Sequence, residues 1–202
     1  MLRKKVSAHQ RRTVLLCSRM DPVSTICALS TAPGTGAIAL VRLSGADSTA
    51  IVRGIAPGLP DTIKPRHAHF VRLRDEQEVI DEAVVTVFPG PNSYTGHDVV
   101  EIAIHGSAYI QQRVLEALIA QGARLAGPGE FTQRAYLNGK LDLSQAEAVA
   151  DLISTTSAAA HRLALQQLRG GYSERIDALR ERLVSLAALV ELELDFGEED
   201  VQ

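Results

Sequence analysis

Two charged residues of this sequence, Arg42 and Glu101, lie within otherwise apolar runs, which makes them candidates for ligand binding. Arg42 lies inside residues 37–44 (AIALVRLS). Burying a guanidinium is costly unless it is paired, and its planar donor fork suits a carboxylate or a planar heterocycle with acceptors. The alternative is an arginine at a strand end that points to solvent. The sequence leaves both interpretations open.

Glu101 lies among Val, Ile and Ala within residues 98–105 (DVVEIAIH). A carboxylate there can accept two N–H bonds side by side, which matches the amino-pyrimidine edge of a pterin. The alternative is an ion pair with an arginine, for which Arg42 is a candidate. His105 ends the same segment, where residues often line sites. Lys140 follows the turn Asn138-Gly139 and would reach an anionic ligand or remain solvated.

Other familiar chemistries are weakly supported or excluded. Residues 34–39 match GxGxxA, but the residues that follow are strand-like, whereas a dinucleotide site needs a helix there. We therefore favour a hairpin-like turn. The sequence contains no GxxxxGK[ST] and no GxSxG, so it has no P-loop and no nucleophile elbow of that type. His67 and His69 share a strand face, but no HExxH pattern accompanies them and we predict no metal site.

Composition describes an ordinary globular protein. The 202 residues are 46% hydrophobic and 22% charged with a formal net charge of -3, which fits one domain or two small ones and excludes a basic nucleic-acid clamp. Cys17 and Cys27 form neither a metal motif nor a disulfide framework, and we expect reduced thiols in a cytoplasmic protein. No apolar run is long enough to span a bilayer.

Periodicity predicts strands and helices in alternation over the first part of the chain. Val79–Phe88 is nearly continuous in valine and predicts a strand buried on both faces. Residues 98–105 alternate, which places Glu101 and His105 on one face with Val99 and Ala103, and Val100, Ile102 and Ile104 on the other. The remaining predicted strands are 25–31, 37–44 and 68–73, and the predicted helices are 46–56, 108–121 and 130–137.

The last third of the chain predicts helices only. Ser144 and Glu147 have the spacing of a capping box, which would begin a helix that runs to Ile153. A second helix is predicted from Ser157 toward Phe196, relaxed at the Gly170-Gly171 pair. Its second half shows an apolar stripe: Ile176, Leu179, Leu183, Leu186, Val190 and Leu194. Such a stripe needs partner helices, and we favour a truncated helical bundle over self-association.

These patterns predict an α/β (α+β) fold with a mixed sheet and flanking helices, followed by long helices. We divide the chain into a basic N-terminal extension (1–20), an α/β domain (21–139) and a helical part (140–202). The extension has no acidic residue before Asp21. It fits an organelle transit peptide or an upstream-extended start, and we favour the second, with the native start at Met20.

Several long motifs together resemble the N-terminal part of the MnmE/TrmE family of tRNA wobble-uridine modification GTPases. In chain order they are APGTGAIA (32–39), RLSG (42–45), FPGPNSYTG (88–96), PGEFTQRAYLNGKLDL (128–143), QAEA (145–148) and DLI (151–153). The resemblance extends from about Ser24 to Phe196. It implies a domain related to folate-dependent aminomethyltransferases, followed by a helical domain that a Ras-like G domain interrupts.

The resemblance also implies ligands and partners. The family binds 5-formyl- or 5,10-methylene-tetrahydrofolate and dimerises through the N-terminal domain. With a flavin-dependent partner of the MnmG/GidA type it builds an aminomethyl-type group on carbon 5 of the tRNA wobble uridine. Carried over by position, the folate contacts fall on Arg42, Glu101 and Lys140, and no catalytic residue is assigned. GTP, potassium and magnesium belong to the G domain, which this sequence does not contain.

The chain departs from the family pattern in two places, and two other functions remain open. His105-Gly106-Ser107 stands where members commonly show His-Gly-Gly, and His97 stands where an acidic residue is common. One alternative is an assembly module without functional folate binding. The other is a free-standing aminomethyltransferase-like enzyme, in which Asp98 or Asp142 would act as acid or base.

Overall fold

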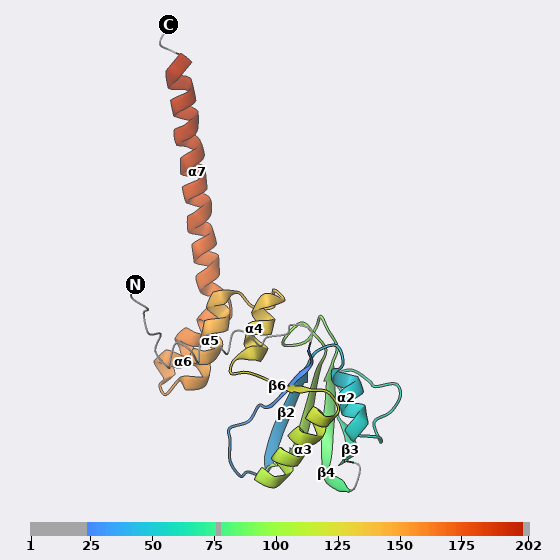
Figure 1. Ribbon diagram of the computed structural model, residues 1–202. Coiled ribbons are helices and arrows are strands. Elements are labelled where there is room, and N and C mark those ends of the chain that lie inside the picture. The colour runs from blue at the N-terminus through green and yellow to red at the C-terminus, as the bar shows by residue number, and fades with distance from the viewer. Residues whose placement is uncertain (1–23, 76–77, 200–202) are drawn as a thin grey trace, which may run out of the picture. The chain divides into compact units, whose positions relative to one another are not determined.

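The computed structural model describes residues 24–75 and 78–199 of the chain (Figure 1). The predicted basic extension, with Cys17 and Met20, lies outside these residues. The chain divides into two compact units, residues 1–140 and residues 141–202. Each unit is described by itself.

The first unit contains a six-stranded mixed sheet, which confirms the predicted α/β class. Its strands follow the order β3-β4-β5-β2-β1-β6, and neighbours are antiparallel except for β1 and β6, which are parallel. The strands are β1 (Ile26–Leu29), β2 (Ile38–Ser44), β3 (His69–Arg74), β4 (Val79–Phe88), β5 (Val99–His105) and β6 (Arg124–Leu125).

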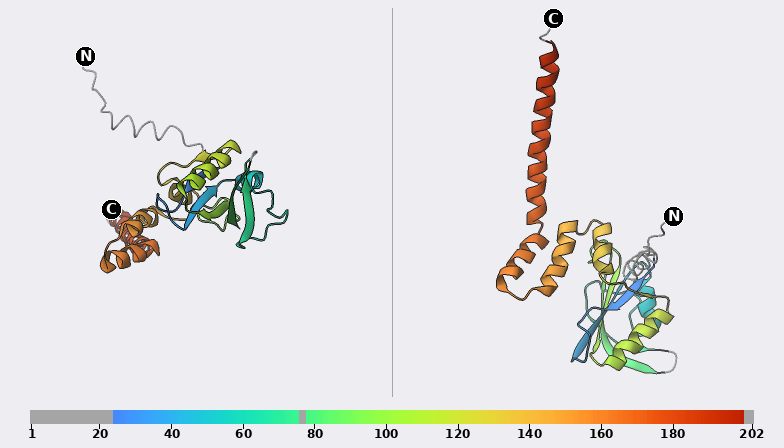
Figure 2. Two further views of the ribbon diagram at one scale, coloured as in Figure 1. Left: turned by 90° about the horizontal axis from the view of Figure 1, so that it is seen from below. Right: turned by 60° about the vertical axis from the view of Figure 1, so that its left-hand side comes forward.

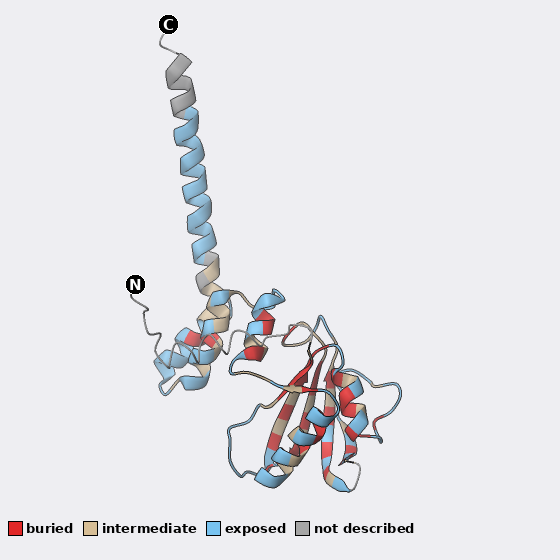
Figure 3. Ribbon diagram, in the orientation of Figure 1, coloured by how far each residue is buried: buried red, intermediate tan, exposed pale blue. Residues whose placement is uncertain are grey.

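Two helices, α2 (Ser48–Ile55) and α3 (Ala108–Ala120), pack on one face of this sheet (Figures 1 and 3). Their aliphatic side chains share one core with every second residue of the strands. On β5 the core-facing residues are Val100, Ile102 and Ile104, as the alternation predicted. Glu101 and Ala103 lie in the opposite phase and are only half-buried, so one strand supplies both a packing face and a polar face.

Two details of this unit differ from the sequence predictions. β4 lies between β3 and β5, yet its burial alternates and Val84 is exposed, so the expected burial on both faces is wrong. The reason is that helices cover only one side of this strand. The short strand β6, which joins the edge of the sheet beside β1, was not predicted. The hairpin interpretation of residues 34–39 is confirmed, because β1 pairs directly with β2 and no helix follows the glycines.

The second unit consists of α5 (Leu143–Ser154), α6 (Ala158–Leu168) and α7 (Gly171–Glu199), with α5 and α6 side by side (Figure 2). The capping box that begins α5 is formed by Asp142 and Gln145, so the predicted box at Ser144 and Glu147 is wrong. The helix starts one residue before Ser144, which removes that hydroxyl from the cap position. Gly170 has a φ of 85° and ends α6, so the predicted second helix is two helices.

On α7, the residues of the predicted apolar stripe whose side chains the structure describes are exposed (Figure 3). Leu179, Leu183 and Leu186 are 55%, 58% and 57% exposed. A helix of this kind gains little stability from its own backbone and is normally held by partner helices. Among the described residues, no helix is long and apolar enough to cross a membrane.

Candidate functional site

Arg42 and Glu101 form an ion pair across the centre of the sheet, on the face opposite α2 and α3. They are register partners on β2 and β5. Arg42 donates from Nε and Nη2 to the same oxygen, Glu101 Oε1, at 2.9 and 2.6 Å. Both side chains are about a quarter exposed, at 25% and 24%. The pair that the sequence left as an alternative is therefore present, and it remains accessible to solvent.

Two aromatic rings surround the guanidinium of Arg42. Its Cζ atom lies 5.3 Å from the centroid of the Tyr94 ring and 5.9 Å from that of Phe131, within the range of cation–π attraction. Tyr94 belongs to the loop after β4, and Phe131 to α4 (Glu130–Leu137). The Tyr94 hydroxyl also lies 2.9 Å from the Thr132 hydroxyl, which joins the loop to the helix. The arginine is thus held in one orientation from three sides.

The loop of residues 89–98 is fixed to the strands and to the segment after α4. Thr95 is fully buried, and its hydroxyl lies 2.7 Å from that of Ser44. Asn138 Nδ2 donates to the Thr95 carbonyl at 2.7 Å. A Cβ atom at Gly96 would lie 3.3 Å from Lys140 Cγ, so the lysine stem lies against this loop. The structure therefore brings Arg42 and Glu101 together directly, and it connects Lys140 to them through the loop.

Two polar atoms near this loop have unused hydrogen-bonding capacity within the described residues. Glu101 Oε2 has no partner there, because both bonds from Arg42 go to Oε1. His97 Nδ1 is buried and also lacks a partner, while its Nε2 lies 3.2 Å from Asn138 Nδ2. A free carboxylate oxygen on a side chain that is 24% exposed, beside aromatic rings, fits a flat ligand that presents N–H donors. The residues present therefore fit a pterin, which would supply the one-carbon unit when bound.

A buried ionic network fixes the start of α4, and hence the position of Phe131. Glu130 is 3% exposed and accepts from Arg124 Nη2 at 2.6 Å, Arg134 Nη2 at 3.2 Å and the Gly127 N–H at 2.8 Å. Burial alone would raise the pKa of Glu130, but these hydrogen bonds and the two positive charges lower it below its usual value. Arg134 also donates to the Ser44 carbonyl at 3.2 Å, which ties the helix to the end of β2.

A second dyad lies at the end of β5. His105 Nδ1 is 2.7 Å from Asp81 Oδ1, and the His105 backbone N–H donates to Asp81 Oδ2 at 2.8 Å. The Glu82 backbone N–H donates to Asp81 Oδ1 at 2.8 Å. The Asp81 side chain is 7% exposed and that of His105 is 68% exposed. A buried carboxylate thus orients an accessible imidazole.

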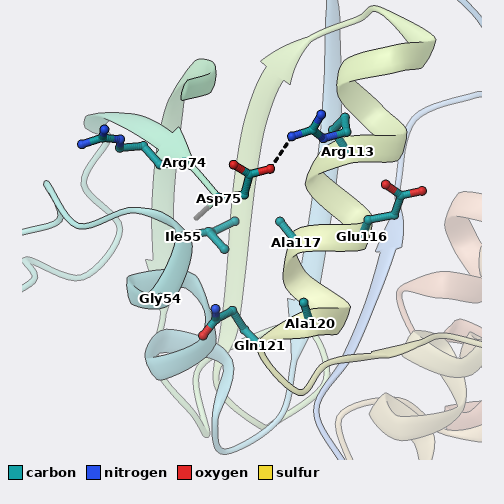
Figure 4. Close-up of a pocket in the computed structure, with 9 residues that line it drawn as sticks. All are labelled: Gly54, Ile55, Arg74, Asp75, Arg113, Glu116, Ala117, Ala120 and Gln121. Atoms are coloured by element: carbon teal, nitrogen blue, oxygen red, sulfur yellow. Dashed lines mark hydrogen bonds and ion pairs between the residues drawn. The ribbon is translucent and has the colours of Figure 1, made fainter. Parts of the chain in front are cut away.

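A cavity of about 680 Å³ lies elsewhere in the first unit, between α2 and α3 (Figure 4). Arg113 from α3 turns toward Asp75 across it and also donates to Glu78. The hydrogen bond from Arg113 to Asp75 is the main reason that the pKa of Arg113 is raised. None of the three predicted ligand contacts lines this cavity. We therefore assign the candidate site to the Arg42–Glu101 face, which carries two of the three predicted contacts.

The described part of the chain holds no cluster of three or more metal-ligating side chains. His69 Nε2 lies 3.3 Å from the Lys64 carbonyl. Cys27 is fully buried in the core, and burial raises the pKa of its thiol to about 11.

Sequence reasoning selected Arg42, Glu101 and Lys140 but missed residues that orient them. Tyr94 and Phe131 belong to the quoted motifs, and an aromatic ring within a loop rich in glycine and proline was the available signal. Asp81 was also missed. It lies in a strand otherwise rich in valine, where a lone carboxylate needs partners.

Comparisons with known proteins agree on one family. The family described as "GTP-binding protein TrmE N-terminus" matches residues 25–140, and the "MnmE helical domain" matches residues 143–202. The chain is 57% identical over 184 residues to the tRNA modification GTPase MnmE of Porphyromonas gingivalis, and 52% identical over 182 residues to that of Flavobacterium johnsoniae. Each alignment covers 88% of this chain and 39% of the relative.

The two family matches follow one another along the chain, the first within residues 1–140 and the second within residues 141–202, the two compact units. Apart from residues 141–142, the motifs that predicted the resemblance lie within these matches, and the prediction of the family is confirmed. This chain belongs to the MnmE/TrmE family of tRNA modification GTPases, of whose curated members it spans about two fifths of the length.

Proposed function

We propose that this chain is the one-carbon tetrahydrofolate-binding and homodimerisation module of a GTPase that modifies carbon 5 of the tRNA wobble uridine in the cytoplasm. Residues 21–139 form the folate-binding domain, and residues 140–202 form the first part of the helical domain. GTP hydrolysis, with its potassium and magnesium ions, belongs to a G domain outside this sequence. The complete modification requires a flavin-dependent partner of the MnmG/GidA type and the tRNA.

The observation that supports folate binding most is the geometry of Glu101. Its Oε1 is engaged by Arg42, whereas Oε2 has no partner among the described residues and belongs to a side chain that is 24% exposed. A 5-formyl- or 5,10-methylene-tetrahydrofolate would present the N–H donors of its pterin edge to this oxygen. Arg42 would hold the carboxylate in place, and Lys140 would attract the anionic glutamate end of the ligand.

Calorimetric titration with 5-formyltetrahydrofolate tests this proposal. We expect binding by the wild-type chain and a loss of at least about tenfold in affinity in Glu101→Gln, because one charged hydrogen-bond acceptor is removed. Glu82→Gln is the matched control, since Glu82 pairs with Arg72 in the same cross-strand manner but lies away from the site. A folded chain that binds no folate would contradict the proposal and favour the assembly module.

The dimerisation part of the proposal rests on apolar side chains of the sheet face opposite α2 and α3. Phe70 on β3 is 68% exposed and Ile38 on β2 is 69% exposed, and both lie in the phase opposite the core residues of their strands. A second copy of the chain would cover them. Light scattering should show a dimer that Phe70→Asp converts to monomer. Ile119→Asp, which changes an exposed aliphatic residue on α3, should leave the dimer intact.

A further inference from the structure

We infer that an exposed basic loop of the first unit is a contact surface for the sugar–phosphate backbone of the RNA that is modified. The basic loop consists of residues 64–67 (KPRH), which are all exposed and lie between α2 and β3 (Figure 1). The inference rests on the proposed tRNA modification and gives the RNA a place on this domain. Three features of the basic loop support it: its charge, its fixed backbone and its contact with the loop of residues 89–98.

The basic loop belongs to a stretch of the chain that carries positive charge only. Residues 62–74 (TIKPRHAHFVRLR) contain one lysine, three arginines and two histidines but no acidic residue. The whole chain has a formal net charge of -3, so this excess is local. Phosphate contacts by lysine and arginine supply most of the affinity of proteins for nucleic acid. A protein that is acidic as a whole can gain such affinity from a patch of this kind.

The fold does not neutralise the cations of the basic loop. Neither Lys64 nor Arg66 forms an ion pair within the described residues. By contrast, Arg53 on α2, Arg72 on β3 and Arg113 on α3 each pair with a carboxylate. A cation that is already paired with a carboxylate has less attraction left for a phosphate. Lys64 and Arg66 therefore keep their charge available for a polyanion.

The backbone of the basic loop is held in one conformation. Arg66 has a φ of 55°, in the left-handed region that a residue with a Cβ atom rarely adopts. Its N–H donates to the Val87 carbonyl at 2.8 Å, and its Nη2 donates to the Asn92 carbonyl at 2.8 Å. His69 Nε2 lies 3.3 Å from the Lys64 carbonyl. An unfavourable backbone conformation that its surroundings maintain is typical of sites that bind.

The bond to Asn92 places the basic loop beside the candidate site. Asn92 and Tyr94 belong to the same loop, and the Tyr94 ring centroid lies 5.3 Å from Cζ of Arg42. Two residues span at most about 7 Å of chain. An RNA strand bound to the basic loop would therefore pass close to the proposed folate. Because the modified atom is a base carbon, the phosphates of the strand are free for these contacts.

Fluorescence anisotropy with a labelled RNA hairpin tests the inference. The probe is an unmodified tRNA anticodon stem-loop with uridine at the wobble position, titrated with the 202-residue chain at several salt concentrations. Each phosphate contact with a single strand contributes about 0.7 to the slope of log affinity against log salt. This corresponds to about fivefold in affinity at about 0.1 M salt, relative to 1 M. Lys64→Gln should therefore bind about fivefold more weakly at about 0.1 M salt and show a slope smaller by about 0.7.

Two further variants separate the basic loop from charge in general. Arg66→Gly removes the second cation and accepts the left-handed φ, so the variant should remain folded. Combined with Lys64→Gln, it should weaken RNA binding about 25-fold at about 0.1 M salt. Arg162→Gln is the matched control, because it removes the same unit charge from an exposed position in the second unit. This control should bind RNA as the wild type does.

Several results would overturn the inference. They are an equal loss of affinity in Arg162→Gln, an unchanged salt slope in the double variant, and no RNA binding by the wild-type chain at about 0.05 M salt. Displacement of the RNA by polyglutamate of equal charge would also overturn it, because the partner would then be an acidic protein.

Calorimetry with 5-formyltetrahydrofolate distinguishes this inference from the proposed folate function. Lys64→Gln should bind this folate as the wild type does, since Lys64 belongs to the RNA surface and not to the folate site. Folate binding without RNA binding would refute the RNA surface alone. RNA binding that depends on Lys64 and Arg66, without folate binding, would refute the folate proposal alone.

Discussion

The Arg42–Glu101 pair should stabilise the folded domain more than the Arg72–Glu82 pair does. Each pair joins register partners on adjacent antiparallel strands, with arginine Nε 2.9 Å from glutamate Oε1. The two pairs differ in exposure, which is 25% and 24% for the first and 69% and 47% for the second. The chain therefore contains its own matched control for the effect of burial on a cross-strand ion pair.

The expected energies follow from that difference. An exposed cross-strand pair such as Arg72–Glu82 contributes about 0.2–1 kcal/mol. Hydrogen bonds to charged groups contribute about 1.5–3 kcal/mol when they are protected from water. Because solvent still reaches about a quarter of each side chain of Arg42–Glu101, we expect a coupling of about 1–2 kcal/mol. The aromatic contacts of Arg42 should enlarge the effect of its single substitution by about 0.5–1 kcal/mol each without changing the coupling.

Two double-mutant cycles measure these couplings. One combines Arg42→Met with Glu101→Gln, and the other combines Arg72→Met with Glu82→Gln, each followed by urea unfolding at low and at high salt. Salt should weaken the more exposed pair more. The reasoning is refuted if the two coupling energies agree within about 0.3 kcal/mol, the usual error of such a cycle, or if the exposed pair is the stronger one.

Three further predictions concern the core, the buried network and the first helix of the second unit. Burial raises the pKa of the Cys27 thiol to about 11. In a Cys17→Ser background, Cys27 should therefore resist iodoacetamide at about pH 8 until urea unfolds the protein. Rapid labelling of the native chain would contradict this prediction. Glu130→Gln should cost about 3–5 kcal/mol at neutral pH, because the buried Arg134 and the partly exposed Arg124 lose their carboxylate. The pKa of Glu130 is lowered on folding, so the stabilisation by its carboxylate is present above the unfolded pKa of 4.5 and is lost as the pH falls through the folded pKa. Urea unfolding from about pH 7 downward should therefore show the free energies of unfolding of the variant and the wild type converging in acid. A difference between them that stays constant with pH would contradict the assignment. Asp142→Ala should destabilise α5 by about 1 kcal/mol in thermal unfolding, because it removes the N-cap side chain. Ser144→Ala should cost nothing, because the Ser144 hydroxyl is buried without a partner in the described structure. A larger loss of stability in Ser144→Ala than in Asp142→Ala would restore the capping box predicted at Ser144.

The sequence predicted most elements of the fold because their patterns are local. Alternation along β5 correctly separated the core-facing residues from Glu101, and Val79–Phe88 was assigned its observed bounds. The burial of that strand was misjudged, because a run of valines does not reveal how many faces the helices cover. The cap of α5 was displaced by two residues, because Asp142 and Ser144 are both good cap residues and only the helix start decides between them.

The candidate site was harder to predict, because its contacts join distant segments. Arg42 and Glu101 are 59 positions apart, and only the register between β2 and β5 makes them partners. The need for a partner was visible in the apolar run around Arg42, but the identity of that partner was not. Tyr94 and Phe131 approach Arg42 from a loop and a helix whose positions depend on the buried Thr95 and Glu130, respectively. No periodicity in the sequence encodes that convergence.

The geometry of the ion pair also determines how ligand binding and stability are related. If Arg42 engaged both oxygens of Glu101, a ligand would have to displace it, and affinity would be gained at the expense of the fold. Both of its hydrogen bonds go to Oε1, however, and Oε2 faces no described partner. The pair and the ligand can therefore use the same carboxylate together, so a bound folate should add to the stability of the domain instead of competing with it. In the proposed complex, Arg42 would act on the ligand through Glu101, by fixing the direction in which Oε2 accepts.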